Sequence, residues 1–310
     1  MSVHSARPRD QARLLGREIP RRYGRKNVMS HRDSETDTEH SPQPGVIQEH
    51  VNAHFDSSAS YWDGVYRGES LQGLIYQQRQ AAVLDNVDAT NLGPGGCVLE
   101  IGCGAGHLTA RLAQRDLAVD AVDASPAMVD SARGLIQEAG LGAHVTLGVA
   151  DVHALPFDER HFDLVVAVGV IPWLHSPGSA VEEMARVLRP GGSLILTADN
   201  RARLASFTDP RAWLALSPLK RAQVAMRRSR GLATSRLDSP RTIDDLLRRS
   251  GLVLEQRRTV GFGPMSFMGR AILSDRRSIR LHRRLQGLAD RGVPGLRGTG
   301  WHYVVRARKP

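Results

Sequence analysis

The sequence has little cysteine and no long apolar run. Its only two cysteines among 310 residues are Cys97 and Cys103, which lie in or beside one short apolar segment. We therefore expect buried thiols rather than a disulfide framework. No apolar run approaches the length that spans a bilayer, none follows the arginine-rich N-terminus, and no metal-ligand spacing is present. These absences disfavour a membrane-spanning, secreted or metal-binding protein and predict a cytoplasmic one.

Acidic residues are scarce in the C-terminal third of the chain. The net charge is +10, but residues 1–200 carry 17 Lys+Arg against 25 Asp+Glu, whereas residues 201–310 carry 25 against 7. A basic C-terminal third predicts an anionic neighbour, either a lipid surface, a nucleic acid or an acidic substrate. The alternative is a face of solvated arginines with no partner.

Three closely spaced glycines follow the apolar run 98–101 and precede a helical pattern. They are Gly102, Gly104 and Gly106. Glycine allows backbone conformations that other residues avoid and lets a ligand approach bare main chain, so a strand, glycine turn and helix predict a nucleotide-type binding corner. A dinucleotide fingerprint would place its third glycine at position 107, which is His107, and an acid, Glu100, stands two residues before the first glycine.

This pattern resembles the first motif of the class I S-adenosylmethionine (SAM) dependent methyltransferases, in the small-molecule, quinone-biosynthesis type. The run 117–123 reads as a second strand that ends in Asp123, whose carboxylate is suited to bind both ribose hydroxyls, and Ser125-Pro126 predicts a helix start. The resemblance implies that Asp151, after a strand over 145–150, binds the adenine amino group and that the Val152 amide meets a ring nitrogen. The cofactor residues expected on this basis are Glu100, Gly102, Gly104, Gly106, Asp123, Ala124, Met128, Asp151, Val152 and Val168.

The resemblance covers residues 95–200 and implies an α/β fold with a Rossmann-like seven-stranded sheet. A fourth strand is expected over 162–168, and a fifth over 194–198 after a helix that the run 190–192 stops. Strands at 252–260 and 301–307 complete the sheet, with the last strand antiparallel between the fifth and sixth. The other strands are parallel, and helices cover both faces. A capping-box variant at 242–245 predicts the start of a helix that ends at Gly251.

The remaining segments are expected to serve one domain. We predict a disordered tail over 1–45 and a single methyltransferase domain over 46–310, with a lid or helix over 46–94, a SAM-binding core over 95–200, and substrate-cap insertions over 201–240 and 261–299. In the resembled family the segment before the first motif often covers the cofactor. Tyr61, Tyr66 and Arg79 are therefore candidates to contact SAM or substrate, although aromatic residues that pack this helix on the core would look the same.

The acceptor is expected near the end of the fourth strand, where Trp173 and His175 lie. His175 is the nearest side chain with a pKa suited to a general base, although a histidine that caps the following helix would occupy the same place. Paired histidines of the family are replaced here by Pro172 and Trp173, so the family's catalytic roles do not carry over to these positions.

Together these features predict a methyltransferase that acts on a small, hydrophobic or amphipathic organic acceptor, with contact to a membrane surface through the basic third. A nucleic-acid acceptor is disfavoured, because residues 168–171 lack the Asn/Asp-Pro-Pro-aromatic tetrapeptide of amino-group methylation and neither cysteine is placed for pyrimidine methylation. The alternatives are an RNA or protein methyltransferase and a non-catalytic SAM-binding regulator. The acceptor atom and the oligomeric state stay open.

Overall fold

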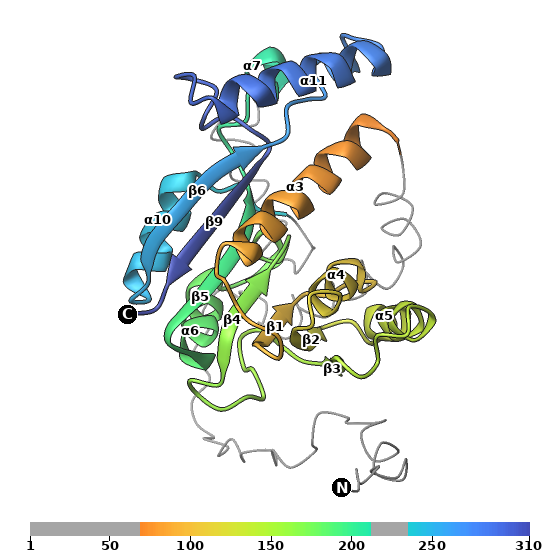
Figure 1. Ribbon diagram of the computed structural model, residues 1–310. Coiled ribbons are helices and arrows are strands. Elements are labelled where there is room, and N and C mark those ends of the chain that lie inside the picture. The colour runs from red at the N-terminus through yellow and green to blue at the C-terminus, as the bar shows by residue number, and fades with distance from the viewer. Residues whose placement is uncertain (1–68, 212–234) are drawn as a thin grey trace, which may run out of the picture.

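The computed structural model describes residues 69–211 and 235–310 (Figure 1). The predicted tail over 1–45, the candidates Tyr61 and Tyr66, and most of the predicted insertion over 201–240 lie outside the described residues. No helix within the described ranges is long and apolar enough to cross a membrane.

A seven-stranded sheet forms the centre of the fold, in the order β3-β2-β1-β4-β5-β9-β6. All neighbouring pairs are parallel except those of β9, which is antiparallel to both β5 and β6. This arrangement confirms the Rossmann-like sheet and the predicted place of its last strand. The strands are β1 (Cys97–Ile101), β2 (Ala118–Asp123), β3 (Val145–Val149), β4 (Phe162–Ala167), β5 (Leu188–Asp199), β6 (Val253–Val260) and β9 (His302–Arg308).

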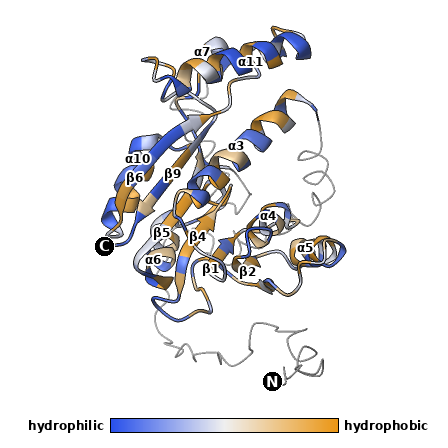
Figure 2. Cartoon of the chain, viewed as in Figure 1, coloured by the Kyte–Doolittle hydropathy of each residue, from blue (hydrophilic) through white to orange (hydrophobic). Residues whose placement is uncertain are grey.

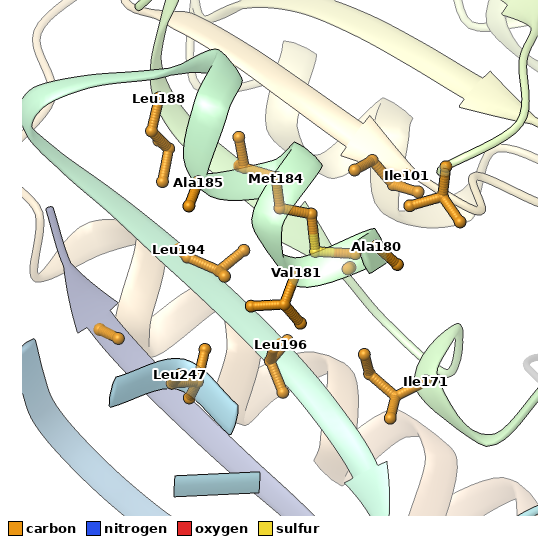
Figure 3. Packing of buried hydrophobic residues seen from close by; sticks show 14 of the residues in the cluster. Ile101, Ile171, Ala180, Val181, Met184, Ala185, Leu188, Leu194, Leu196 and Leu247 are labelled. Carbon is orange, nitrogen blue, oxygen red and sulfur yellow. The ribbon is translucent and has the colours of Figure 1, made fainter. Parts of the chain in front are cut away.

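Helices cover both faces of this sheet, as predicted, because successive strand residues point to opposite sides. In β4, Leu164 and Val166 join one buried cluster with α3, α4 and α5, whereas Val165 and Ala167 join another with α6 and α10. Figure 3 shows the second cluster, where α6 packs on β5. The helices are α3 (Leu71–Asp88), α4 (His107–Ala113), α5 (Pro126–Glu138), α6 (Pro177–Val187) and α10 (Pro240–Arg249). Strands β4 and β5 are apolar along much of their length (Figure 2).

The capping and turn residues of the sequence predict one helix start correctly and two other helix ends wrongly. The Ser125 hydroxyl accepts the Met128 N–H at 3.1 Å, so this N-cap is confirmed. The helix expected to begin with a capping box at 242–245 is instead capped by Ser239, whose hydroxyl accepts the Thr242 N–H at 3.1 Å. The run 190–192 does not stop a helix, because α6 ends at Val187 and these residues already belong to β5.

The chain beyond β6 forms a small hairpin and a long helix. The hairpin pairs β7 (Ser266–Phe267) with β8 (Arg270–Ala271), and α11 (Asp275–Asp290) follows it. A one-turn helix, α7 (Ala205–Thr208), lies after β5 and contacts β7. Figure 1 shows α7 and α11 beyond the end of the sheet where β6 finishes, which is the edge formed by the carboxyl ends of the parallel strands.

Candidate functional site

The three glycines of the motif all have positive φ, but they differ in what surrounds them. A Cβ at Gly102 (φ 71°) would lie 2.5 Å from Val170 Cγ2, and a Cβ at Gly106 (φ 85°) would lie 3.0 Å from Ala132 on α5. A Cβ at Gly104 (φ 53°) would meet nothing within 4 Å. Gly102 and Gly106 therefore permit close packing within the protein, whereas Gly104 presents bare backbone to an open space.

Asp123 ties the glycine turn to the second strand. Its side chain accepts two backbone hydrogen bonds, from Gly104 N–H at 2.9 Å and from Ser125 N–H at 2.9 Å. These bonds hold the carboxylate at the carboxyl end of β2, beside the start of α5. The structure thus places this acid where the sequence predicts a ribose-binding side chain.

Glu100 is a buried carboxyl beneath the same turn. It is 2% exposed, and Thr109 of α4 donates a hydrogen bond to its Oε2 at 2.6 Å. Burial raises the pKa of Glu100 to about 8, and the hydrogen bond from Thr109 opposes that rise only in part. The group is therefore largely protonated at neutral pH, and a cation brought beside it would favour its ionised form.

One pocket joins the glycine turn to the carboxyl ends of the neighbouring strands. Nine of the ten predicted cofactor residues line it, and Gly106 does not. The part of the pocket formed by these residues is called the cofactor half below. Its members are Glu100, Gly102, Gly104, Asp123, Ala124, Met128, Asp151, Val152 and Val168.

Trp173 lines the pocket, but His175 is not among its lining residues. The His175 ring instead stacks on His153 with 3.8 Å between ring centroids, and His153 Nδ1 lies 2.8 Å from Asp151 Oδ1. Burial lowers the pKa of His175, and the neighbouring His153 lowers it further. A general-base role for His175 therefore has no support in this geometry.

The same pocket is also lined by residues that the motif does not contain. Tyr76, Arg79 and Gln80 of α3 line it together with Asp199, the last residue of β5. With Trp173 they form what we call the acceptor half. Of these five residues, the sequence predicts only Arg79 and Trp173 as candidates. The one available signal for Asp199 is an acid that directly follows an apolar strand.

His302 stands behind Asp199 as its direct partner across the β5–β9 ladder. Its Nδ1 lies 3.0 Å from Asp199 Oδ1, and its buried Nε2 has no hydrogen-bond partner within the described residues. Burial lowers the pKa of His302 to about 4, and Arg79 and Arg203 add to that effect. The imidazole is therefore neutral at pH 7, and its Nδ1–H donates to the carboxylate.

Two arginines border this pair, each stacked on an aromatic ring. The Arg79 guanidinium lies 4.6 Å from the Tyr76 ring centroid, and the Arg203 guanidinium lies 4.2 Å from that of Trp301. Burial lowers the pKa of Arg203, which Asp199 partly restores. The acceptor half thus combines the anionic Asp199 with the cationic Arg79, whereas carboxyl groups dominate the cofactor half.

Comparison with known proteins decides which family this pocket belongs to. The model of the methyltransferase domain family matches residues 99–196, the segment that forms the glycine turn and strands β2 to β5. Residues 99–196 thus form a SAM-dependent methyltransferase domain. Beyond this segment β9 lies antiparallel between β5 and β6, as the family resemblance implied.

Relatives of this methyltransferase domain act on different acceptors. A ubiquinone biosynthesis O-methyltransferase of Azoarcus sp. is 33% identical over 104 residues, covering 34% of this chain and 44% of that protein. A phosphatidylethanolamine N-methyltransferase of Cereibacter sphaeroides is 38% identical over 102 residues, covering 33% and 50%. The chain thus spans half or less of the curated relatives that it matches.

Solved structures share the fold across most of the chain. Magnesium protoporphyrin IX methyltransferase from Synechocystis PCC 6803 with bound SAH superposes with a TM-score of 0.57 at 18% identity, covering 84% of this chain and 97–98% of the other in its SAH- and SAM-bound forms. Likeness at this identity establishes the fold and leaves the acceptor open.

The residues of the cofactor half suit SAM. Open space lies beside Gly104 where a Cβ would otherwise stand, so a ligand can lie against its main chain. The acids Glu100, Asp123 and Asp151 line the same pocket and favour a cationic ligand. SAM carries a sulfonium and an ammonium group, together with a ribose and an adenine that need hydrogen-bond acceptors. Within the described ranges no cluster of three or more His, Cys, Asp or Glu side chains is arranged to hold a metal ion.

Proposed function

We propose that this protein transfers the methyl group of SAM to a small organic acceptor. The observation that carries the proposal is the single pocket in which nine motif residues adjoin a second half of different chemistry. Bound SAM would supply an activated methyl group, so the protein's contribution is to align donor and acceptor and to exclude water. Gly104 would lie against the methionine portion, Asp123 would hold the ribose, and Asp151 with Val152 would hold the adenine.

We assign the acceptor's proton to Asp199, with His302 as the residue that positions it. Asp199 lines the pocket and its Oδ1 is held by His302, which is neutral and buried behind it. A carboxylate held in this way accepts a hydrogen bond from an acceptor O–H or N–H and would take the proton as the new bond to the methyl carbon forms and the bond from that carbon to sulfur breaks. This assignment replaces the predicted role of His175.

The acceptor is proposed to be hydrophobic or amphipathic. The acceptor half includes the aromatic side chains of Tyr76 and Trp173 beside its charged groups, which suits an organic ring or chain with one polar end. Tyr61 and Tyr66 remain proposed contacts from the lid over 46–94. The division into that lid, a core and cap insertions at 201–240 and 261–299 also stays a prediction, as does a cytoplasmic location.

The test uses SAM with an isotopically labelled methyl group and fractionated cell extract. Label that enters the small-molecule fraction, with Asp199→Asn reducing transfer while calorimetry shows unchanged SAM affinity, would support the proposal. Label found only in RNA or protein would favour the macromolecular methyltransferase. SAM binding with no transfer to any fraction would favour the non-catalytic regulator, and absence of SAM binding would reject all three.

A further inference from the structure

Four large apolar side chains are exposed on α7 and the hairpin. Phe207, Phe267, Met268 and Ile272 have relative exposures of 53–58%. Phe207 belongs to α7, which contacts β7, while the other three lie on or beside the β7–β8 hairpin. Apolar side chains that gather on one surface rather than scatter over it are typical of a contact with another body.

Helix α11 presents a stripe of arginines next to that hairpin. Its buried residues Ser278, His282, Gln286 and Ala289 recur at helical spacing and face the body of the protein. The exposed arginines lie on the opposite side, where no acidic residue interrupts them between Asp275 and Asp290. None of them forms an ion pair within the described residues. They are Arg276, Arg277, Arg280, Arg283 and Arg284.

Both features lie at the edge of the sheet that holds the pocket. Ile272 precedes Asp275, the first residue of α11, by three positions, so the hairpin leads directly into the arginine stripe. Figure 1 shows α11 and α7 beyond the carboxyl ends of the parallel strands, and Figure 2 shows hydrophilic residues along α11. The pocket is lined by residues at these same carboxyl ends.

We propose that the exposed hairpin side chains and the α11 arginines form one face that docks on an anionic lipid surface. This docking face consists of Phe267, Met268 and Ile272 together with the five arginines. Arginines near an anionic membrane each contribute about 1 kcal/mol, and inserted apolar side chains add a second, short-range attraction. Two weak signals of this kind give reversible, peripheral binding.

A lipid surface fits the docking face better than a nucleic acid does. Both partners would be attracted by five arginines, so charge alone does not distinguish them. Single strands are held by stacking of successive bases on several aromatic side chains, yet Phe267 is the one aromatic side chain of the docking face, and Met268 and Ile272 beside it are thioether and aliphatic groups. A lipid bilayer, unlike a phosphate backbone, has an apolar interior that receives such side chains.

The proposal deepens the proposed function, on which its catalytic consequence rests. An amphipathic acceptor concentrates in membranes, and a docking face at the pocket edge would bring the acceptor half close to it. Lipid binding itself does not require methyl transfer, so the two can fail separately.

The experiment is sedimentation of the full chain with vesicles of phosphatidylcholine and phosphatidylglycerol in equal parts, against vesicles of phosphatidylcholine alone. We expect binding to the anionic vesicles that weakens as salt rises, because the Debye length shortens. A triple variant should bind the anionic vesicles about 100-fold more weakly, since it loses three charges at about 1 kcal/mol each. It combines Arg276→Gln, Arg280→Gln and Arg283→Gln.

Two further variants separate the explanations. A second triple variant should weaken vesicle binding about tenfold or more while it leaves all charges in place. It combines Phe267→Ser, Met268→Ser and Ile272→Ser. A matched control removes three exposed arginines of α10, with Arg241→Gln, Arg248→Gln and Arg249→Gln, and should change binding about threefold at most. Calorimetry with SAM should give the same affinity for all three variants as for the unaltered chain.

Three results would overturn the docking face. The first is no preference for anionic vesicles at low salt. The second is binding to RNA but not to vesicles, with no effect of the serine substitutions. The third is vesicle binding that appears only after the acids at positions 33, 35, 37 and 39 are neutralised, because the arginine stripe would then serve the chain's own acidic segment. Loss of SAM binding with vesicle binding intact would instead reject the proposed function alone.

Discussion

The two halves of the pocket are built in different ways. The cofactor half rests on main chain and on carboxyl groups that backbone N–H groups hold, as where Asp123 accepts from Gly104 and Ser125. The acceptor half rests on side chains from distant segments, with three from α3, one from β5 and Trp173 from the turn 171–173, while His302 of β9 holds Asp199 from behind. SAM is the same ligand in every relative, so a short local motif is enough to bind it. The acceptor differs among relatives, and its side chains can be exchanged in evolution without disturbing the glycine turn.

The largest effect is expected where the cofactor half supports the fold itself. Gly102→Ala should lower the free energy of unfolding by about 2–4 kcal/mol, because the new Cβ meets Val170 Cγ2 at 2.5 Å and the backbone has φ 71°. Gly104→Ala, with open space around its Cβ, should cost stability only through its φ of 53° but should weaken SAM binding. Denaturant unfolding and calorimetry on both variants would measure this contrast. Equal losses of stability would contradict it.

His302, which holds Asp199 of the acceptor half, should make the free energy of unfolding depend on pH. The pKa of His302 falls from 6.5 to about 4 on folding, so the unfolded state binds more protons between these values. Stability should therefore rise with pH from about 4 to about 6.5, by at most about 3 kcal/mol, and should level off above that. His302→Gln should flatten this part of the curve in chemical denaturation at a series of pH values. An unchanged slope would show that His302 is not buried in the neutral form.

Exchange of one acid in each half should separate binding from turnover. Asp123→Ala should weaken SAM binding by about 1–3 kcal/mol, because hydrogen bonds to a charged group are lost. Asp199→Asn should leave the SAM affinity within about twofold, since Asp199 lies in the other half, and should lower transfer once an acceptor is known. Titration calorimetry with SAM measures both affinities. A similar loss of SAM affinity in both variants would remove the distinction between the halves.

The smallest expected effect concerns the buried acid of the cofactor half. Because the pKa of Glu100 is raised to about 8, a cationic ligand beside it should favour its ionised form, and SAM affinity should increase with pH up to about 8. Thr109→Val removes the hydrogen bond at 2.6 Å and should move this rise to higher pH, at a cost of about 1 kcal/mol near neutrality. Calorimetry in buffers of different ionisation enthalpy would report the released proton. An affinity that is independent of pH would contradict this coupling.

The ease of predicting each region follows from how far apart its residues lie in the chain. The seven-stranded sheet could be predicted from its apolar runs, and eight of the nine residues of the cofactor half from glycines and terminal acids that fall within 98–152. The partnership of Asp199 with His302 could not, because 103 residues separate them and only the strand register brings them together. His175 is close to β4 in sequence, yet its ring stacks on His153 and does not line the pocket.

Errors at element ends have equally local causes. Ser239 and Thr242 both suit a helix start, and their hydroxyls lie 2.8 Å apart, so the sequence alone does not rank them. Gly192 looked like a helix stop, but a Cβ there would lie 3.0 Å from the Asp163 carbonyl oxygen. That glycine permits the close approach of β5 to β4 and so belongs to the strand.

The position of β9 between β5 and β6 has a consequence for how the protein matures on the ribosome. Among residues 69–211 and 235–310, strand β6 pairs in the sheet with β9 alone, so this pairing waits until synthesis has passed residue 308. The contact between Asp199 and His302 likewise cannot form until the 103 residues that follow Asp199 have been synthesised. A nascent chain could therefore complete its SAM-facing corner early, yet it would gain a finished acceptor end only after release of its last strand from the exit tunnel.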